Sequence, residues 1–134
     1  MLSQDLEDWL TDSGDEVLHK SEQTWNEAER VLYEIWLLDT ETRNGGVSQY
    51  FANRGRKQWN LCVSAAKRAS IASFESFARR VEAMVEGAQD PYEALIDRGA
   101  EPDNAWDEVQ VAVVSELKAY VVRSNTSLER TRER

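Results

Sequence analysis

The ten residues from Asn44 to Asn53 hold the residue types in this sequence that are best suited to binding chemistry. An Asn-Gly-Gly opens the stretch, and a glutamine, two aromatic residues and an asparagine follow it. These hallmark residues are Asn44, Gly45, Gly46, Gln49, Tyr50, Phe51 and Asn53. Side-chain amides both donate and accept hydrogen bonds. Gln49, Tyr50 and Asn53, together with Arg54, could therefore line a small pocket for a ligand or a peptide.

The same stretch also fits a purely structural role. Asn44 and the two glycines would end a helix, because Asn and Gly adopt the left-handed conformation of helix ends readily. Gln49 and Asn53 would then satisfy backbone groups of the loop, and the two aromatic rings would join the core. The residues alone leave both interpretations open.

Residues that usually carry catalysis or hold metals are scarce. The chain has a single histidine, His19, and a single cysteine, Cys62, far apart in the sequence, which makes a Cys–His nucleophile pair a poor candidate. Gly45-Gly46 lacks the Lys-Ser/Thr of a phosphate-binding loop. Paired Glu-x-x-His motifs and a calcium loop of alternating acids are also absent. We therefore expect no catalytic residue, no metal, no cofactor and no enzymatic activity.

The charge is large and unevenly distributed along the chain, with a net value of −9. Residues 1–41 hold 12 acids against 2 bases (−10), residues 42–80 hold 8 bases against 1 acid (+7), and residues 81–134 hold 12 acids against 6 bases (−6). Such a chain would repel phosphates, so we expect no direct binding of nucleic acid. Either the basic middle packs beside the acidic helices and neutralises them, or an uncompensated acidic face binds a basic protein partner.

The acids that could form such a face fall into two groups. The first group is Asp5, Asp8, Asp12, Asp15, Glu16, Glu22, Glu27, Glu34 and Glu41, and the second is Asp90, Glu93, Asp97, Asp103, Asp107 and Glu108. Within the first group, Glu27, Glu34 and Glu41 are spaced seven apart. This spacing predicts that they share the solvent-facing side of one helix.

The candidate acids and the hallmark residues must be positioned by helices, which the apolar periodicity of the first third of the chain predicts. An i, i+3, i+4 apolar spacing predicts a short helix over residues 3–10, followed by a turn at residues 11–14. A capping box at Thr24–Glu27 and a continuous apolar stripe predict a long helix over about residues 24–43. The Asn-Gly-Gly would end it.

Two or three helices are expected in the middle of the chain. A short helix would begin near Ser48 and end at Gly55. The apolar stripes that follow predict helices over about residues 57–69 and 72–86, with Ser70 or Ser73 as a cap for the second. One continuous helix bent near Ser70 is the alternative.

The last third of the chain predicts two more helices. Asp90-Pro91 is a strong start signal for the first of them, and Gly99 would end it. Asp103 or Asn104 would cap the last helix. Residues 125–134 lack periodic apolar residues, which predicts a flexible charged tail.

These patterns predict an all-α fold: one compact domain over residues 1–124, built as an irregular bundle of five to seven helices. No apolar run is long enough to span a membrane, and the acidic N-terminus lacks the features of a secretory signal. A lone cysteine fits a reducing compartment. We therefore expect a cytoplasmic protein, either monomeric or homodimeric.

The segment Glu29–Trp36, followed by Asn44–Asn53, resembles a bacterial family of domains, the DNA-mimic-protein-like family. Its hallmark is Asn-Gly-Gly, an apolar residue, any residue, Gln, two aromatics and a nearby Asn, entered from a helix. The chain matches these positions, with Val47 as the apolar residue, but has Thr42-Arg43 where the family often carries a glutamate. The resemblance implies an all-helical fold whose acidic surface imitates DNA phosphates and occupies the DNA-binding surface of a transcription factor or nucleoid protein.

Overall fold

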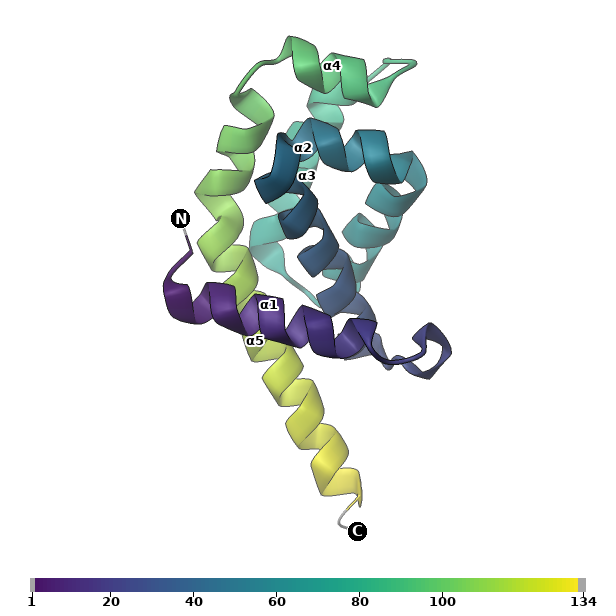
Figure 1. The fold of residues 1–134 in the computed structure, drawn as a ribbon, viewed down its shortest axis with the longest axis vertical. Coiled ribbons are helices and arrows are strands. Elements are labelled where there is room, and N and C mark those ends of the chain that lie inside the picture. Colours follow the sequence, from purple (N-terminus) through teal and green to yellow (C-terminus); the bar gives the residue numbers. More distant parts are fainter. Residues whose placement is uncertain (1, 133–134) are drawn as a thin grey trace.

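A computed structural model describes the backbone of residues 2–132 and the side chains of residues 2–125. Its elements are α1 (Gln4–Leu18), the 3₁₀ turn η1 (Glu22–Thr24), α2 (Glu27–Arg68), α3 (Ala72–Val85), α4 (Pro91–Asp97) and α5 (Glu101–Arg132). The described residues contain no strand, which confirms the all-α prediction. Figure 1 shows α1 crossing in front of α2, while α4 covers one end of the molecule and α5 runs along its length.

Helix α2 changes direction twice, at glycines. Gly46 (φ 89°) and Gly55 (φ 79°) take left-handed conformations that a residue with a Cβ adopts only with strain. The helix therefore runs as three segments over residues 27–44, 47–54 and 56–68. These segments correspond to the three predicted helices, and Figure 1 shows the third returning beside the first.

The start of α2 differs from the prediction by two residues. Asn26, not Thr24, is the N-cap, because its side chain accepts from the amide of Glu29 at 2.8 Å and Glu29 returns a bond to the Asn26 amide at 3.1 Å. Thr24 instead donates its hydroxyl to the carbonyl of Ser21 within η1. The sequence pattern could not separate the two candidates, because Thr24 and Asn26 both stand three residues before a glutamate.

The prediction of a turn at residues 11–14 is wrong. Helix α1 runs through it without interruption from Gln4 to Leu18. Gly14 is buried, and a Cβ at this position would lie 2.3 Å from Cδ1 of Trp36. The glycine therefore permits close approach of α1 to α2 rather than a change of chain direction.

Helices α2 and α3 are separate, as predicted, but neither Ser70 nor Ser73 caps α3 through its side chain. Ser70 takes a left-handed conformation (φ 57°) at the break, and Ile71 occupies the N-cap position. Glu116 of α5 supplies the missing acceptor. Its carboxylate accepts from the amide of Ser73 at 3.1 Å and also from the Ser73 hydroxyl.

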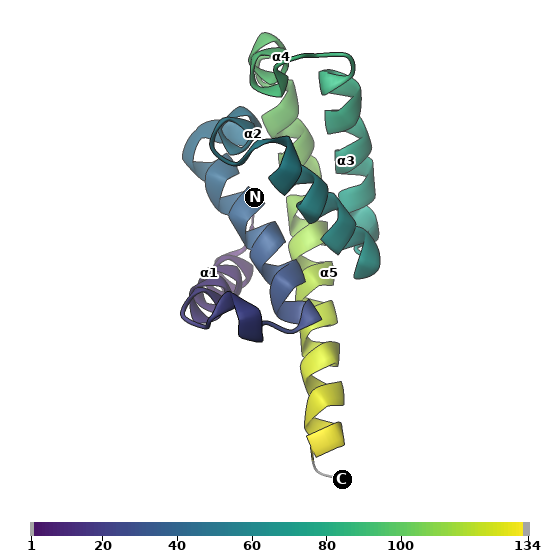
Figure 2. The same cartoon turned by 90° about the vertical axis from the view of Figure 1, so that its right-hand side faces the viewer.

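The last two helices follow the predicted signals in part. Asp90 caps α4 by accepting from the amide of Tyr92 at 3.0 Å, and Gly99 (φ 62°) follows its end. Helix α5 begins at Glu101, before the predicted cap, so Asp103 lies inside its first turn. It continues through Arg132, into the segment predicted as a tail, and projects beyond the body of the molecule (Figure 2). The division into a domain and a flexible tail stays a prediction.

Aromatic rings fill the centre of the bundle. Trp59, Phe74, Phe77 and Trp106 are each no more than 1% exposed, and the Phe77 and Trp106 ring centroids lie 5.0 Å apart. These rings join α2, α3 and α5 into one core. Cys62 is fully buried beside them, so it serves as a small core residue, and burial raises the pKa of its thiol.

Replacing Gly14 by alanine tests the close approach of α1 to α2. Ala normally stabilises a helix interior by about 1 kcal/mol relative to Gly. At this position the new methyl group would displace Trp36, so we expect Gly14→Ala to lower the free energy of unfolding by about 1–3 kcal/mol. Urea denaturation measures this change, with the exposed Thr11→Ala in the same helix as control. A gain in stability from Gly14→Ala would contradict the packing described.

Candidate functional site

Within the hallmark stretch, the break in α2 leaves one backbone amide, that of Val47, without a helical partner. The amide of Val47 donates instead to Oδ1 of Asp103 in α5, at 2.8 Å. A Cβ at Gly46 would lie 2.9 Å from the other oxygen of the same carboxylate. Asp103, predicted as a partner-binding acid, therefore caps the middle segment of α2 and holds it against α5.

The two amide side chains of the hallmark bind a carboxylate of their own chain. Gln49 and Asn53 donate to Oε2 of Glu41 at 3.2 and 2.8 Å, and Arg54 approaches its other oxygen at 3.4 Å. Burial raises the pKa of Glu41, but the bonds from Asn53 and Gln49 and the charge of Arg54 outweigh it and hold the pKa below 4.5. The amides thus join the first and second segments of α2 across the break.

The two aromatic residues of the hallmark belong to the core, as the structural interpretation of the stretch expects. Tyr50 is fully buried and Phe51 is 5% exposed, and both rings contact Trp59. The hydroxyl of Tyr50 is buried without a hydrogen-bond partner among the described residues, and burial raises its pKa. Such a group is costly, so nothing in the core favours Tyr over Phe at this position.

The three glutamates spaced seven apart on α2 do not face solvent together, so that prediction is wrong. The returning segment of α2 covers this side of the first segment. Arg68 pairs with Glu27 at 2.7 Å, Gln58 donates to Glu34 at 2.6 Å, and Glu41 binds the hallmark amides. Burial raises the pKa of Glu34. The three acids hold the folded-back helix together.

A buried carboxylate that the sequence analysis did not single out connects three helices. Asp39 is fully buried; its Oδ1 accepts from Trp106 at 3.1 Å and from Gln110 at 2.7 Å, and its Oδ2 lies 2.6 Å from Arg43. Arg43 also pairs with Glu7 of α1 at 2.7 Å. The network ties α1 and α5 to α2 and compensates the buried charge.

The sequence carried a signal for this network. Asp39 stands four residues after Ile35, so it continues the buried stripe of α2, and Arg43 stands four residues after Asp39. A charged pair at i, i+4 on an apolar stripe indicates a buried ion pair.

The basic middle of the chain is neutralised within the molecule. Six of the eight bases in residues 42–80 form ion pairs with acids. In order, Arg43, Arg54, Arg56, Arg68, Arg79 and Arg80 pair with Glu7, Glu41, Glu82, Glu27, Glu75 and Glu108. Among the described residues, Lys57 and Lys67 have no acidic partner. For residues 42–80, the interpretation that the basic segment packs beside acids of the same chain and is neutralised by them therefore holds.

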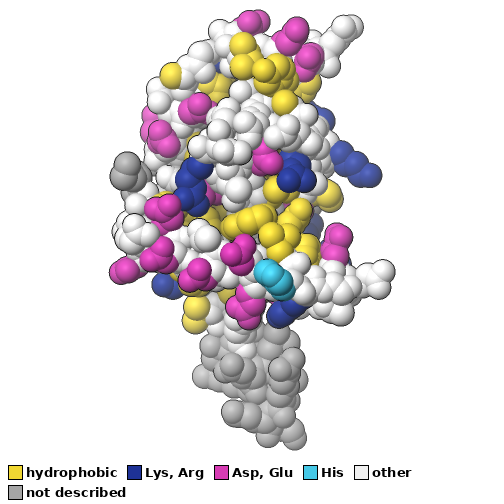
Figure 3. Space-filling view, in the orientation of Figure 1, with side chains coloured by type: hydrophobic (Ala, Val, Ile, Leu, Met, Phe, Trp, Pro, Cys, Tyr) yellow, Lys and Arg dark blue, Asp and Glu magenta, His cyan; other side chains and the backbone are white. Residues whose placement is uncertain are grey.

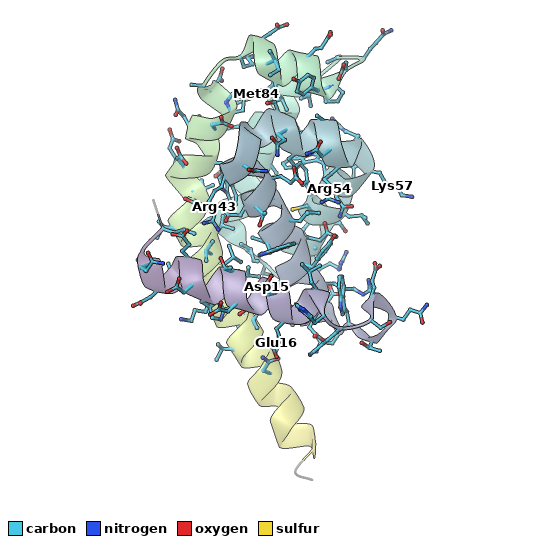
Figure 4. The ribbon with its side chains drawn as sticks, viewed as in Figure 1. Asp15, Glu16, Arg43, Arg54, Lys57 and Met84 are labelled. Carbon is cyan, nitrogen blue, oxygen red and sulfur yellow. The ribbon has the colours of Figure 1, made fainter. Side chains whose placement is uncertain are left out.

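Helix α1 is different, because it carries acids and no base. Asp5, Asp8, Asp12, Asp15 and Glu16 are all exposed, and none has an ion pair with a described residue. Their spacing places them on one side of α1, opposite the face that packs on α2. In Figure 3 acidic side chains follow α1 across the molecule, and Figure 4 labels Asp15 and Glu16 on this helix with Arg43 above it. We call these five residues the α1 acidic stripe.

The other predicted acids are divided between exposed and structural positions. Glu22 in η1 and Glu93, Asp97 and Asp107 on α4 and α5 are exposed. Asp90 caps α4, and Glu108 pairs with Arg80 at 2.5 Å. Because Asp90, Asp103 and Glu108 make structural contacts, fewer acids of the second group are available to a partner than the sequence suggests.

The described part of the chain contains neither a clustered metal site nor a membrane-spanning helix. No group of three or more His, Cys, Asp or Glu is arranged there to hold a metal ion. None of its helices is both long enough and apolar enough to cross a membrane. The single histidine, His19, is exposed, and its Nδ1 lies 2.7 Å from the carbonyl of Asp15.

Most of the chain matches the model of a known protein family. Residues 23–125 match the family described as DMP19-like protein. No curated protein and no solved structure matches the chain. The matched range includes the hallmark stretch and helices α2 to α4, but it begins after the α1 acidic stripe.

Replacing Glu41 tests its role as the acceptor of the hallmark amides. Because its pKa in the folded state is depressed, Glu41 contributes stability above its ordinary pKa of 4.5 and loses it as the pH falls through the folded value. We expect Glu41→Gln to lower the free energy of unfolding by about 1–2 kcal/mol at neutral pH. The difference from wild type should shrink near pH ~3. Urea denaturation at both pH values measures the change, with the exposed Glu93→Gln as control. If the loss of unfolding free energy in Glu41→Gln were the same at both pH values, this role of Glu41 would be disproved.

Removing the unpaired hydroxyl of Tyr50 is expected to stabilise the protein, in contrast to the replacement of Glu41. Tyr50→Phe keeps the ring and removes a buried polar group that has no partner. We expect the free energy of unfolding to rise by about 1 kcal/mol. A marked loss of stability in the same denaturation experiment would mean that the hydroxyl makes a bond in solution.

Proposed function

The chain belongs to the DMP19-like protein family, and from this premise we propose that it is a non-enzymatic protein that binds a basic, DNA-binding protein. In this proposal it acts as a DNA mimic: it occupies the surface that a transcription factor or nucleoid protein uses for DNA. The observation that carries the proposal is the α1 acidic stripe, five exposed acids without a base on the same helix.

The charge density of the stripe supports this proposal. Residues 5–16 of a helix span about 16 Å, so five acids give roughly one charge per 4 Å along the axis. One strand of duplex DNA carries a charge per roughly 3.4 Å. Arginines and lysines that neutralise phosphates would therefore meet a similar array of carboxylates, and the attraction would weaken as salt is added.

The pairing of bases elsewhere in the molecule also supports it. Since the arginines of residues 42–80 are held by acids of the same chain, they compensate the body of the protein and leave α1 negative. Arg43, which reaches α1, is already shared between Glu7 and Asp39. Duplex DNA itself would be repelled by this surface.

The alternative is a small-ligand or peptide-binding module built around Asn44–Asn53. It has less support, because Gln49 and Asn53 already donate to Glu41 and the ring of Tyr50 is buried. The proposal places the protein in the cytoplasm with its DNA-binding partner, as a monomer or a homodimer.

Neutralising the stripe tests the proposal. In a pull-down at low salt, we expect the wild type to recover a DNA-binding protein that added salt and competing duplex DNA both release. The variant Asp8→Asn, Asp12→Asn, Asp15→Asn and Glu16→Gln should bind that protein about tenfold more weakly, since several exposed ion pairs are lost together. It retains Asp5, whose charge favours the first turn of α1.

The matched control removes four exposed acids outside α1, with Glu86→Gln, Glu93→Gln, Asp97→Asn and Asp107→Asn. Its net charge equals that of the stripe variant, so equal losses in both would show that net charge, not the stripe, determines binding. The proposal is wrong if no DNA-binding protein is recovered, or if duplex DNA fails to compete.

A further inference from the structure

Three aromatic side chains form a partly exposed surface that the hydrophobic core does not absorb. Trp25, Tyr33 and Trp36 lie in sequence from η1 into α2, with ring centroids 4.9 Å apart for Trp25–Tyr33 and 6.1 Å for Tyr33–Trp36. All three are partly buried, packed against the core at one edge. Tyr33 stands between the two indoles, so the three rings form one aromatic row.

The aromatic row lies directly beside α1. Trp36 covers Gly14, and the indole nitrogen of Trp25 donates to the carbonyl of Val17 at 3.1 Å. Leu18, at the end of α1, is 45% exposed. Figure 3 shows hydrophobic surface immediately above the acidic side chains of α1, on the same face of the molecule.

Charges of both signs lie near the row. Burial is the main cause that raises the pKa of Tyr33; Arg54 acts in the opposite direction, and the nearby Glu34 and Glu22 add to the rise. Arg54 is itself paired with Glu41. Asp15 of the stripe lies in the last turn of α1, near Gly14. Because Arg54 is already paired, the carboxylates of Glu34, Glu22 and the α1 acidic stripe would attract a cation that approached these rings.

We propose that the α1 acidic stripe and the aromatic row form one docking surface for an arginine-rich segment of a partner protein. The carboxylates attract several cationic side chains, and the guanidinium of one arginine stacks on Tyr33 and its neighbours. This inference rests on the proposed function and specifies the partner chemistry. Charge complementarity selects a basic occupant, and the rings select arginine among basic residues.

The physical basis is the difference between the two cations. Arg has a planar, weakly hydrated guanidinium that stacks on aromatic faces, whereas the Lys ammonium is a compact and strongly hydrated point charge. Carboxylates alone attract both. A cation–π contact at an exposed site corresponds to an affinity gain of about two- to fivefold.

Two peptides of equal length and charge, one with arginines and one with lysines at the same positions, test the inference by calorimetry at fixed ionic strength. We expect the full-length wild type to bind the arginine peptide about two- to fivefold more tightly. Tyr33→Leu should remove most of this preference, and Tyr33→Phe should keep it because the ring remains. Tyr92→Leu, at an exposed tyrosine of α4, is the matched control and should leave the preference unchanged.

The outcomes separate this inference from the proposal on which it rests. If the wild type binds both peptides equally, and both dissociate as salt is added, the aromatic row has no role while the acidic stripe keeps its own. If neither peptide binds at low salt, the proposed function fails as well. The arginine preference of the wild type needs no substitution, so the inference stays testable even if Tyr33→Leu impairs folding. A preference that survives in folded Tyr33→Leu would overturn it.

Discussion

The break in α2 at Gly45–Gly46 is the constraint on which the rest of the structure depends. A helix that stops and restarts there must provide an acceptor for the freed amide of Val47, and Asp103 of α5 provides it at 2.8 Å. A second glycine, Gly55, then sends the chain back beside its own first segment. Two turns within one continuous helical run thereby determine where α5 docks and which side of α2 is covered.

The covered side of α2 explains how several acids are held within the molecule. Acids that would otherwise face water are bound by the middle and returning segments of α2. Burial raises the pKa of Glu34, while hydrogen bonds and the charge of Arg54 hold the pKa of Glu41 below its ordinary value. Six of the eight bases of residues 42–80 are paired with acids of the same chain, whereas the five acids of the α1 acidic stripe stay exposed.

The hallmark stretch carries structural roles in this protein. Its glycines provide the turn, its amides hold Glu41, and its aromatic rings fill the core beside Trp59. The part of the chain that identifies the family is thus separate from the exposed acids on which the proposed function rests. The matched range of residues 23–125 begins after α1.

The sequence by itself determined the all-α fold, the breaks at Gly45–Gly46 and Gly55, and the cap at Asp90, because periodicity, glycine and capping act over a few residues. Tertiary structure alone decided that Gly14 is a packing site, that Glu116 caps α3, and that Glu41 and Asp103 are structural. It also left the five acids of the α1 acidic stripe exposed, without an ion pair to a described residue. A helical pattern shows which residues share a face. It does not show which distant segment covers that face, since that depends on contacts between residues tens of positions apart.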